Sequence, residues 1–322
     1  MNQNTKNLPL LRRAGRFFNR KFLAMFGIAV TIVPKPEWMR KKRIVTTQVG
    51  RFQIEVPNFN TVSWYYSLHP NYTSQQGRVA AQVKKKYPKL AAIDIGANVG
   101  DTVCIMKTAA DIPILCIEGD ESTFALLEKN LQQFRDVTAH KLFLGEKTET
   151  ISVNFEKVGW NTTLQPDASN SGTRINIIRL DDFLKNKADV DCFKLLKIDT
   201  EGFDCRIIRG AQEYIQKVRP VITFEYNREN MDAIGEPGLD TLFMLGDLGY
   251  TKIMLHDANG RFLCTADLSN RSLIQDLHDY ADGKRGAIYY YDMTVFHQDD
   301  ADLATAFMEA EQVVHRNKDF IY

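Results

Sequence analysis

From residue 89 onward the sequence alternates short apolar runs with longer amphipathic segments, and this alternation constrains the fold more than any other feature. Apolar runs of strand length lie at 90–95, 114–118, 139–144, 193–199 and 221–225. Segments with helical periodicity separate or follow them, at 99–109, 122–134, 180–186, 205–217 and 239–248. Strands that alternate with helices are typical of βα units around a parallel sheet. We therefore predict an α/β protein with a doubly wound, mostly parallel sheet.

The two ends of the chain add to this plan. Two later apolar runs, 251–256 and 287–297, predict a mixed edge and bring the sheet to seven strands. A loop with the turn dipeptide Asn259-Gly260 joins them, and 301–315 reads as a last helix. For the 322 residues we predict an N-terminal extension (1–74), one α/β domain (75–300) and a C-terminal helix (301–322).

The extension contains an apolar run at 22–33, preceded by five basic residues. This run is shorter than the roughly 20 residues that a membrane-spanning helix needs. Two interpretations follow: a helix docked on the fold, or a basic apolar helix that contacts an anionic membrane surface. The formal net charge of +1 gives no reason to expect a nucleic-acid partner. Five scattered cysteines without a C-x-x-C pair predict a reducing compartment, the cytoplasm.

The most informative motif is Asp-Ile-Gly-Ala-Asn-Val-Gly-Asp at 94–101, where the first strand turns into the first helix. Gly96 and Gly100 allow a tight turn and close approach of a ligand, and the helix N-terminus offers N–H groups to an anion. The spacing G-x-x-x-G departs from the G-x-G-x-x-G of dinucleotide loops. Asp94, at the strand end, would repel a pyrophosphate and attract an ammonium or sulfonium group. These features favour S-adenosylmethionine over a dinucleotide, with a ligand-free turn as the alternative.

Further acids follow other predicted strands. Glu118 ends the second strand, where an acid accepts hydrogen bonds from ribose hydroxyls. Asp199 and Glu201 follow the fourth strand and Glu225 ends the fifth, so all three should reach the same sheet edge. Asp199 and Glu225 are placed to hold a divalent ion such as Mg²⁺, or to share a proton so that one acts as a base. A third role for Asp199 is a cap of the next helix, and the sequence leaves these roles open.

Several segments together resemble the FkbM family of methyltransferases: 94–100, 178–184, 197–202, 209–211 and 219–225. The resemblance covers about residues 75–297 and implies a class I, Rossmann-like methyltransferase fold with S-adenosylmethionine as donor. It also implies O-methylation, commonly of a hydroxyl of a sugar, a glycan or a secondary metabolite. Gly119, where the family often has proline, and Asp101, where a bulkier residue is usual, depart from the pattern.

The resulting site prediction has two sets of residues. The cofactor-binding set is Asp94, Gly96, Ala97, Asn98, Gly100, Asp101, Thr102, Glu118, Gly119 and Asp199. The catalytic set is Asp199, Glu201 and Glu225. For the acceptor, the aromatic residues Trp64, Tyr65, Tyr66 and Trp160 are candidates to stack on a sugar ring, or else to pack in the core.

Two other functions fit parts of the sequence. A nicotinamide-dependent oxidoreductase would use a Tyr-x₃-Lys pair, and Tyr280 and Lys284 have that spacing in a glycine-containing segment. The other is a scaffold that binds a nucleoside without turnover, and the acids Asp94, Glu118, Asp199 and Glu225 argue against such an inactive site. Metal requirement, acceptor identity and oligomeric state stay open at this stage.

Overall fold

The computed structural model describes residues 44–57, 62, 65–66, 69, 71–158, 161–167, 169, 171–257, 259–282 and 288–317. The chain divides into two compact units, Met1–Lys41 and Lys42–Tyr322, and every described residue belongs to the second. The predicted surface helix at 22–33, together with Trp64 and Trp160, therefore lies outside the described residues. Within the described ranges, no helix is long and apolar enough to cross a membrane.

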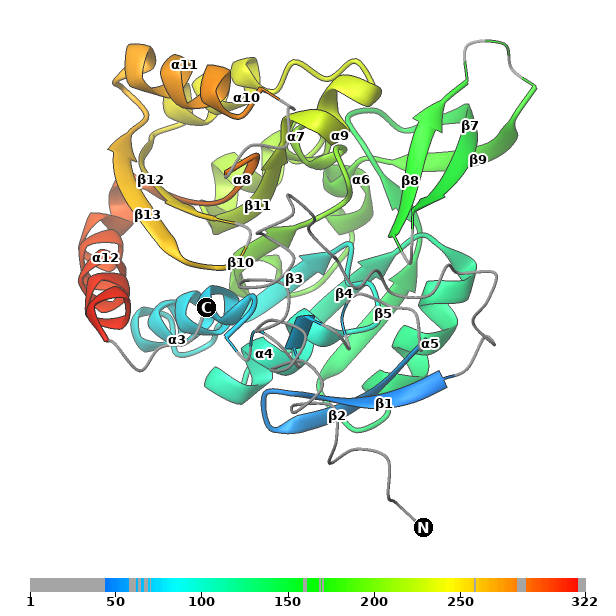
Figure 1. Ribbon diagram of the computed structural model, residues 1–322, viewed down its shortest axis with the longest axis horizontal. Helices are drawn as coiled ribbons and strands as arrows, with labels where there is room; N and C mark the ends of the chain where they lie inside the picture. Colours follow the sequence, from blue (N-terminus) through cyan, green and yellow to red (C-terminus); the bar gives the residue numbers. More distant parts are fainter. Residues whose placement is uncertain are drawn as a thin grey trace, which may run out of the picture. The chain divides into compact units, whose positions relative to one another are not determined.

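An eight-stranded sheet forms the centre of this unit (Figure 1). Five strands are parallel: β3 (Ala91–Ile95), β4 (Ile114–Glu118), β5 (Val137–Lys141), β10 (Phe193–Ile198) and β11 (Val221–Asn227). The mixed edge consists of β14 (Tyr290–His297), β12 (Tyr250–His256) and β13 (Phe262–Asp267), and β14 runs antiparallel to β11. The order is β13-β12-β14-β11-β10-β3-β4-β5, so the winding reverses between β3 and β10. Ligands of open α/β sheets bind at such a reversal.

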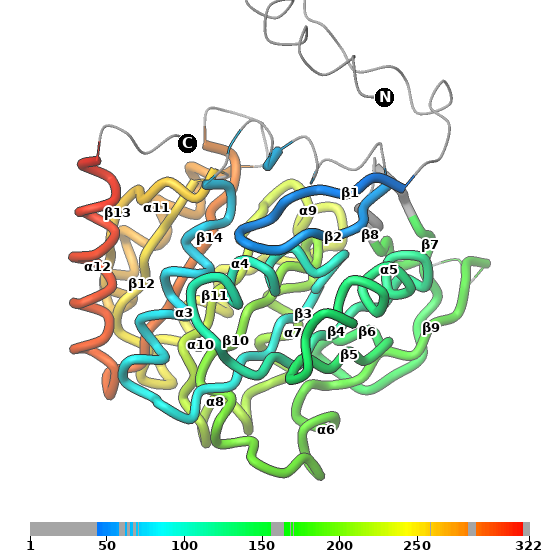
Figure 2. Tube along the Cα trace, turned by 90° about the horizontal axis from the view of Figure 1, so that it is seen from below, coloured from blue at the N-terminus to red at the C-terminus, as the bar shows by residue number. Residues whose placement is uncertain are grey.

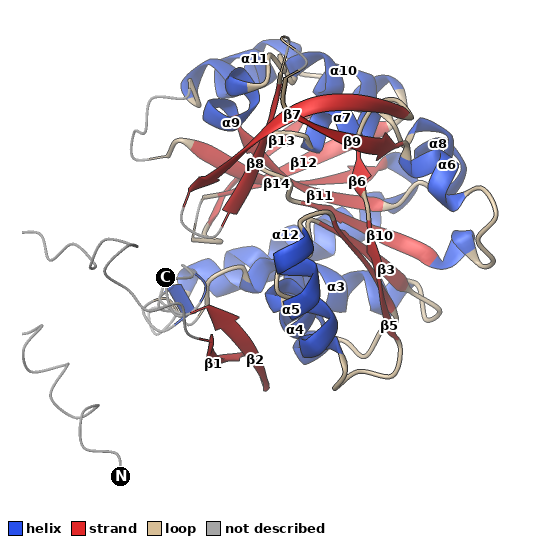
Figure 3. Ribbon diagram, turned by 90° about the vertical axis from the view of Figure 1, so that its right-hand side faces the viewer, coloured by secondary structure: helices blue, strands red, loops and turns tan. Residues whose placement is uncertain are grey.

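Helices cover both faces of the sheet (Figure 3). One face carries α3 (Ser74–Lys86), α4 (Asp101–Ala109), α5 (Glu121–Leu131) and α12 (Ala301–Arg316). The other carries α6 (Leu180–Leu184), α7 (Asp204–Arg209), α8 (Gln212–Val218), α9 (Arg228–Ala233), α10 (Leu239–Asp247) and α11 (Arg271–Tyr280). In β3, Ile93 and Ile95 pack in the core under helices α6 to α11, whereas Ala92 packs in the core under α3, α4, α5 and α12. This alternation follows from the two-residue period of a strand. The predicted α/β class is confirmed.

Three predictions of element bounds are wrong. The sheet has eight strands rather than seven, because β13 pairs with β12 where we expected only a loop. The run at 139–144 is split: β5 ends at Lys141, and β6 (Phe143–Leu144) joins a different sheet. The predicted helix at 205–217 breaks at Gly210, where a Cβ atom would stand 2.1 Å from the carbonyl oxygen of Gly145.

A second sheet is inserted between β5 and α6 and projects from the domain (Figure 1). Its order is β6-β9-β7-β8, with β7 (Glu149–Val158), β8 (Asn161–Pro166) and β9 (Thr173–Ile178). Strand β7 ends at Val158 and β8 begins at Asn161. Leu164 and Gln165 of β8 line the pocket described below, so this insertion contributes to the site.

The described part of the predicted extension packs against the domain. A hairpin of β1 (Ile44–Val49) and β2 (Phe52–Pro57) lies beside α4 and α5 (Figure 2). Asn130 of α5 connects them: its Oδ1 accepts from the Glu55 N–H at 2.8 Å, and its Nδ2 donates to the Glu55 carbonyl at 2.9 Å. The same Nδ2 donates to the carbonyl of Val99 at 2.8 Å, which ties the hairpin to the loop that precedes α4.

Candidate functional site

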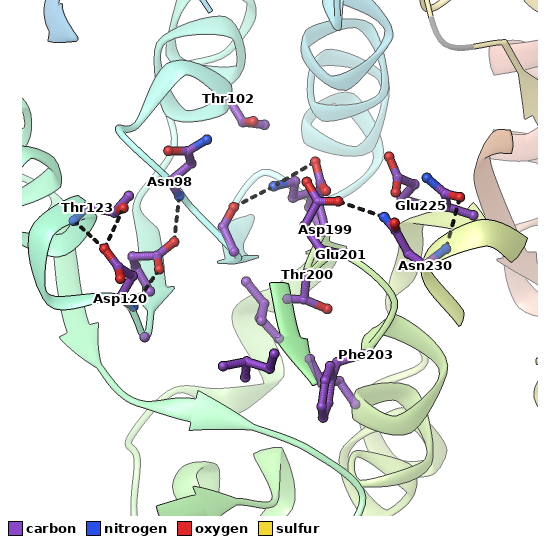
Figure 4. A pocket seen from close by; sticks show the side chains of 18 of the residues that line it. Asn98, Thr102, Asp120, Thr123, Asp199, Thr200, Glu201, Phe203, Glu225 and Asn230 are labelled. Atoms are coloured by element: carbon purple, nitrogen blue, oxygen red, sulfur yellow. Dashed lines mark hydrogen bonds and ion pairs between the residues drawn. The ribbon is translucent and has the colours of Figure 1, made fainter. Parts of the chain in front are cut away.

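A pocket of about 530 Å³ lies at the carboxyl ends of the parallel strands, where the winding reverses. Its size is within the range of small-molecule sites. One side, the donor half, is lined by Gly96, Asn98, Asp101, Thr102, Glu118, Gly119, Asp120, Thr123 and Phe143. The other side, the acceptor half, is lined by Tyr65, Tyr72, Thr200, Glu201, Glu225, Asn227, Asn230, Tyr289 and Tyr290. Asp199 lines the pocket between the two halves, as Figure 4 shows.

The glycine loop shapes the donor half through its backbone. Gly96 has a φ of +71°, and a Cβ atom there would stand 1.8 Å from the carbonyl oxygen of Asp199. Only glycine therefore allows β3 and β10 to end so close together. Gly100, with a φ of +88°, lies next to Leu127 of α5.

Glu118 is held by the backbone of both neighbouring loops. Its Oε2 accepts from the Asn98 N–H at 3.0 Å and its Oε1 from the Asp120 N–H at 2.8 Å. Burial raises the pKa of Glu118 to about 7, although these backbone donors act in the opposite direction. An ionised carboxylate has about four acceptor positions, so it retains capacity for two ligand hydroxyls.

Asp94 does not line the pocket, which corrects the predicted contact with a cationic ligand. It is fully buried, and its Oδ1 lies 3.0 Å from the Nζ of Lys197, its register partner on β10. Burial alone would lower the pKa of Lys197, but Asp94 and Asp199 raise it above the ordinary value, so the lysine is charged. Lys197 also donates to the carbonyl of Gly96 at 3.1 Å. Asp94 thus balances the charge of Lys197, and Lys197 in turn holds the glycine loop through the Gly96 carbonyl.

Gly119 and Asp101, which depart from the family pattern, each contact an aromatic residue. A Cβ atom at Gly119 would meet the ring of Phe143 at 2.1 Å, so an aromatic ring occupies the space that a larger residue would need. Asp101, at the first turn of α4, accepts a hydrogen bond from the Tyr66 hydroxyl at 3.2 Å. Burial raises the pKa of Asp101 to about 6. Phe143 therefore forms part of the pocket wall and Tyr66 supports it, and no sequence motif marks Phe143.

In the acceptor half, the loop after β10 presents its acids in a constrained conformation. Glu201 has a φ of +54°, a left-handed conformation that is costly for a residue with a side chain. Its Oε2 accepts from the Asn230 Nδ2 at 2.6 Å (Figure 4). Gly202 follows with a φ of +105°, and a Cβ atom there would stand 2.7 Å from the Asn230 carbonyl oxygen. The loop is thus fitted against α9, which holds Glu201 at the pocket.

Glu225 and Asp199 differ in their surroundings. Asp199 is about half exposed (47%) and its Oδ2 lies 3.8 Å from the Nζ of Lys197. The Oε1 of Glu225 is buried, and no described residue forms a hydrogen bond with it. Burial, together with Asp199, Glu201, Asp204 and Asp292, raises the pKa of Glu225 well above its ordinary value.

Most of the predicted residues meet at this pocket. Those that line it are Gly96, Asn98, Asp101, Thr102, Glu118, Gly119, Asp199, Glu201 and Glu225, whereas Asp94, Ala97 and Gly100 do not. Tyr65 lines the pocket and Tyr66 is buried behind it, so the extension supplies part of the wall. Sequence reasoning missed Tyr72, Tyr290 and Lys197; for Lys197, a charged residue inside an apolar run was a usable signal.

Two alternatives gain nothing from the geometry. In the part of the chain that the structure describes, no three His, Cys, Asp or Glu side chains are grouped to hold a metal ion. Tyr280, the tyrosine of the oxidoreductase hypothesis, ends α11 with 61% of its surface exposed and does not line the pocket. Its partner Lys284 lies outside the described residues.

Comparisons with known proteins point to one family. The model of the methyltransferase FkbM domain matches residues 94–252. Methyltransferase 1 of Beauveria bassiana (strain ARSEF 2860) is 24% identical over 144 residues, which cover 38% of this chain and 58% of the relative. The chain therefore spans somewhat more than half the length of that relative.

Similar solved structures include the methyltransferase FkbM from Methylobacillus flagellatus KT, with a TM-score of 0.39 and 15% identity. That match covers 65% of this chain and 43% of the other. The precorrin-6y C5,15-methyltransferase from Geobacter metallireducens GS-15 has a TM-score of 0.32 and 14% identity, over 65% of this chain and 80% of the other.

The fold and the site together define a class. Five parallel strands, the reversed strand β14 beside them, and a glycine loop at the winding reversal are the architecture of a class I methyltransferase. Within that class, residues 94–252 match the model of the FkbM methyltransferase domain, which gives the family of that part of the chain.

Proposed function

We propose that the protein transfers a methyl group from S-adenosylmethionine to a hydroxyl oxygen of a sugar, a glycan or a secondary metabolite. One observation carries this proposal: the pocket joins a half suited to a nucleoside with a half rich in carboxyl groups, and Asp199 lies between them. A hydroxyl group is a weak nucleophile until a base accepts its proton, and the second half offers such bases.

The donor half fits the adenosyl group of the cofactor. Glu118 would accept hydrogen bonds from the ribose hydroxyls, since it lines the pocket and its carboxylate retains acceptor capacity beside the two backbone donors. Phe143 and Thr123 would flank the adenine, and the loop at Gly96 and Asn98 would receive the methionine part. When bound, the cofactor supplies an activated methyl group, which is the difficult part of the chemistry.

The acceptor half would orient the hydroxyl and accept its proton. Asp199, Glu201 and Glu225 come from two elements and converge on one wall (Figure 4). The tyrosines Tyr65, Tyr72, Tyr289 and Tyr290 provide flat apolar faces on which a sugar ring can pack. The function of the protein chain is then to hold the oxygen in line with the methyl group and to exclude competing water.

Calorimetry and a transfer assay test this proposal. S-adenosylhomocysteine should bind at micromolar concentration, while NADH at the same concentration should give no heat of binding. A panel of sugars, glycan fragments and hydroxylated metabolites should then include acceptors that gain a methyl group, as mass spectrometry would show. Binding of NADH in place of S-adenosylhomocysteine would refute the assignment, and methyl transfer only to nitrogen or carbon would refute O-methylation.

We also propose a cytoplasmic location, with peripheral membrane contact through the basic N-terminus. In support, the five cysteines are free thiols, as a reducing compartment requires. The proposed acceptor is a small molecule or a glycan, and no nucleic acid is expected to bind. Cell fractionation tests the location: the full chain should appear in the soluble and the salt-extractable membrane fractions, and recovery outside the cell would contradict it.

A further inference from the structure

A second carboxyl group lies directly opposite Glu225 in the sheet. In the antiparallel pairing of β11 with β14, Glu225 and Asp292 are register partners, so their side chains leave the sheet on the same face. Side chains at such positions start about 5 Å apart, and like charges there repel each other. Both groups are partly buried on the face covered by α3, where Gln75 and Gln76 also contact the sheet. Burial and mutual repulsion therefore oppose the ionisation of both carboxyl groups together at neutral pH.

Their surroundings differ in a way that decides which one holds the proton. The Nε2 of Gln75 donates to the Oδ2 of Asp292 at 3.0 Å, which favours an ionised Asp292. Burial and Asp199 raise the pKa of Asp292 well above its ordinary value, and Lys197 opposes them only in part. Glu225 has no comparable support, since the described residues give its buried Oε1 no hydrogen-bond donor.

The groups around Glu225 are almost all acidic. From the loop after β10, from α7 and from β14, it is approached by Asp199, Glu201, Asp204 and Asp292, and the hydroxyls of Tyr72 and Tyr290 interact with it electrostatically. Each of these acids opposes a negative charge on Glu225, and Lys197 is already paired with Asp94. Where two acids share a site and their surroundings separate their pKa values, one keeps its proton while the other is ionised.

We propose that Glu225 acts as a neutral carboxylic acid that donates a hydrogen bond to the acceptor, that Asp292 is the positioning residue that keeps it protonated, and that Asp199 accepts the proton of the reacting hydroxyl. This inference rests on the proposed function and assigns separate tasks to two acids that the sequence left equivalent. Asp199 suits the role of base because it is half exposed, so it can pass the proton on to solvent.

The step balances without a further reactant. The hydroxyl proton passes to the carboxylate of Asp199 as the acceptor oxygen takes the methyl group, and the electron pair of the broken S–C bond stays on sulfur. The proton of Glu225 is not consumed; its hydrogen bond only orients the acceptor oxygen. Asp199 then loses its proton to water.

Isotope-edited infrared or ¹³C NMR spectroscopy tests the protonation directly, without an acceptor. In the S-adenosylhomocysteine complex at pH 7.5, a protonated glutamic acid signal should be present in the wild type and absent in Glu225→Gln. In Asp292→Asn the same signal should titrate at a pH about one unit lower or more, since the opposing charge is gone. The exposed-surface variant Asp240→Asn should leave it unchanged.

An ionised Glu225 in the wild type at pH 7.5 would overturn the inference, and this result needs no variant other than Glu225→Gln to assign the signal. An unchanged titration in folded Asp292→Asn would overturn the role of Asp292. Failure of S-adenosylhomocysteine to bind would instead refute the proposed function, while the carboxyl signal of the free protein would still report the protonation.

Activity provides a second, independent readout once an acceptor is found. Glutamine can donate the same hydrogen bond, so Glu225→Gln should keep kcat within about fivefold of the wild type, whereas Glu225→Ala should lose about tenfold or more. A general base cannot be replaced by an amide. Glu225→Gln with activity as low as that of Glu225→Ala would therefore contradict the assignment.

Discussion

The donor half and the acceptor half of the pocket are built by different means. The donor half depends on backbone geometry: Gly96 approaches the Asp199 carbonyl, and two N–H groups hold Glu118. The acceptor half depends on side chains from separate elements, such as Glu201 with Asn230 and Asp292 with Gln75. A half fixed by backbone suits a constant cofactor, whereas a half made of side chains can vary with the acceptor without disturbing the fold.

The largest effect is expected in the acceptor half, from Asp199→Asn. Loss of a general base typically lowers the rate by about 10²- to 10⁴-fold. We expect kcat to fall by that amount at saturating donor, while the free energy of unfolding changes little because the side chain is half exposed. Steady-state kinetics beside the Asp240→Asn control would measure this. Activity within tenfold of the wild type would mean that another group accepts the proton.

In the donor half, Gly96→Ala should damage the fold as well as the site. The new Cβ atom would clash with the Asp199 carbonyl oxygen at 1.8 Å, and the left-handed backbone would add roughly 1–2 kcal/mol of strain. Gly235→Ala is the matched control, since Gly235 has a φ of +68° but no heavy atom within 4 Å of the added Cβ. Urea unfolding should show a clearly larger loss for Gly96→Ala. Equal losses would show that the close approach of the strands is unimportant.

A smaller effect, with a distinct pH dependence, is expected from Glu118. Its pKa is raised to about 7, so the carboxylate that accepts ribose hydroxyls is present above that pH and is lost as the pH falls. The affinity for S-adenosylhomocysteine should therefore decrease between pH 8 and pH 6, approaching tenfold per unit below pH 7. Glu118→Gln should bind about tenfold more weakly at pH 8 and show a flat profile. Calorimetry across this range measures both, and a sloping profile in the variant would assign the titration to another group.

The smallest effect should come from Gly119, where the neighbour is a side chain that can move. Gly119→Ala should weaken S-adenosylhomocysteine binding only a few-fold, because its Cβ would meet the Phe143 ring at 2.1 Å and displace it. The double variant with Phe143→Leu should recover part of the affinity. If the loss of binding free energy in the double variant equals the sum of the losses in the two single variants, the two residues act separately.

The same contrast explains what the sequence could predict. The donor half lies largely within residues 96–123, so its motif, strand ends and first helix can be found from one continuous stretch. Asp199, Glu201 and Glu225 were also predictable, because strand ends of a parallel sheet meet at one edge. The sequence does not show the register in which neighbouring strands pair. The pairing of Lys197 with Asp94 and of Asp292 with Glu225 depends on which residues face each other across strands.

The residues that were missed share this cause. Tyr72 and Tyr290 line one pocket although 218 residues separate them along the chain, and nothing local marks them as neighbours. β13 was missed because one short run beside a turn dipeptide is ambiguous until β12 offers a partner. Local signals thus located the cofactor loop, while long-range pairing decided the acceptor half.

The most direct test of the whole account is the crystal structure of the complex with S-adenosylhomocysteine. We expect the ribose hydroxyls within hydrogen-bond distance of Glu118, the adenine beside Phe143, and the sulfur atom facing Asp199. A ligand bound elsewhere, or in the same pocket with its ribose away from Glu118, would contradict the division of the pocket into donor and acceptor halves.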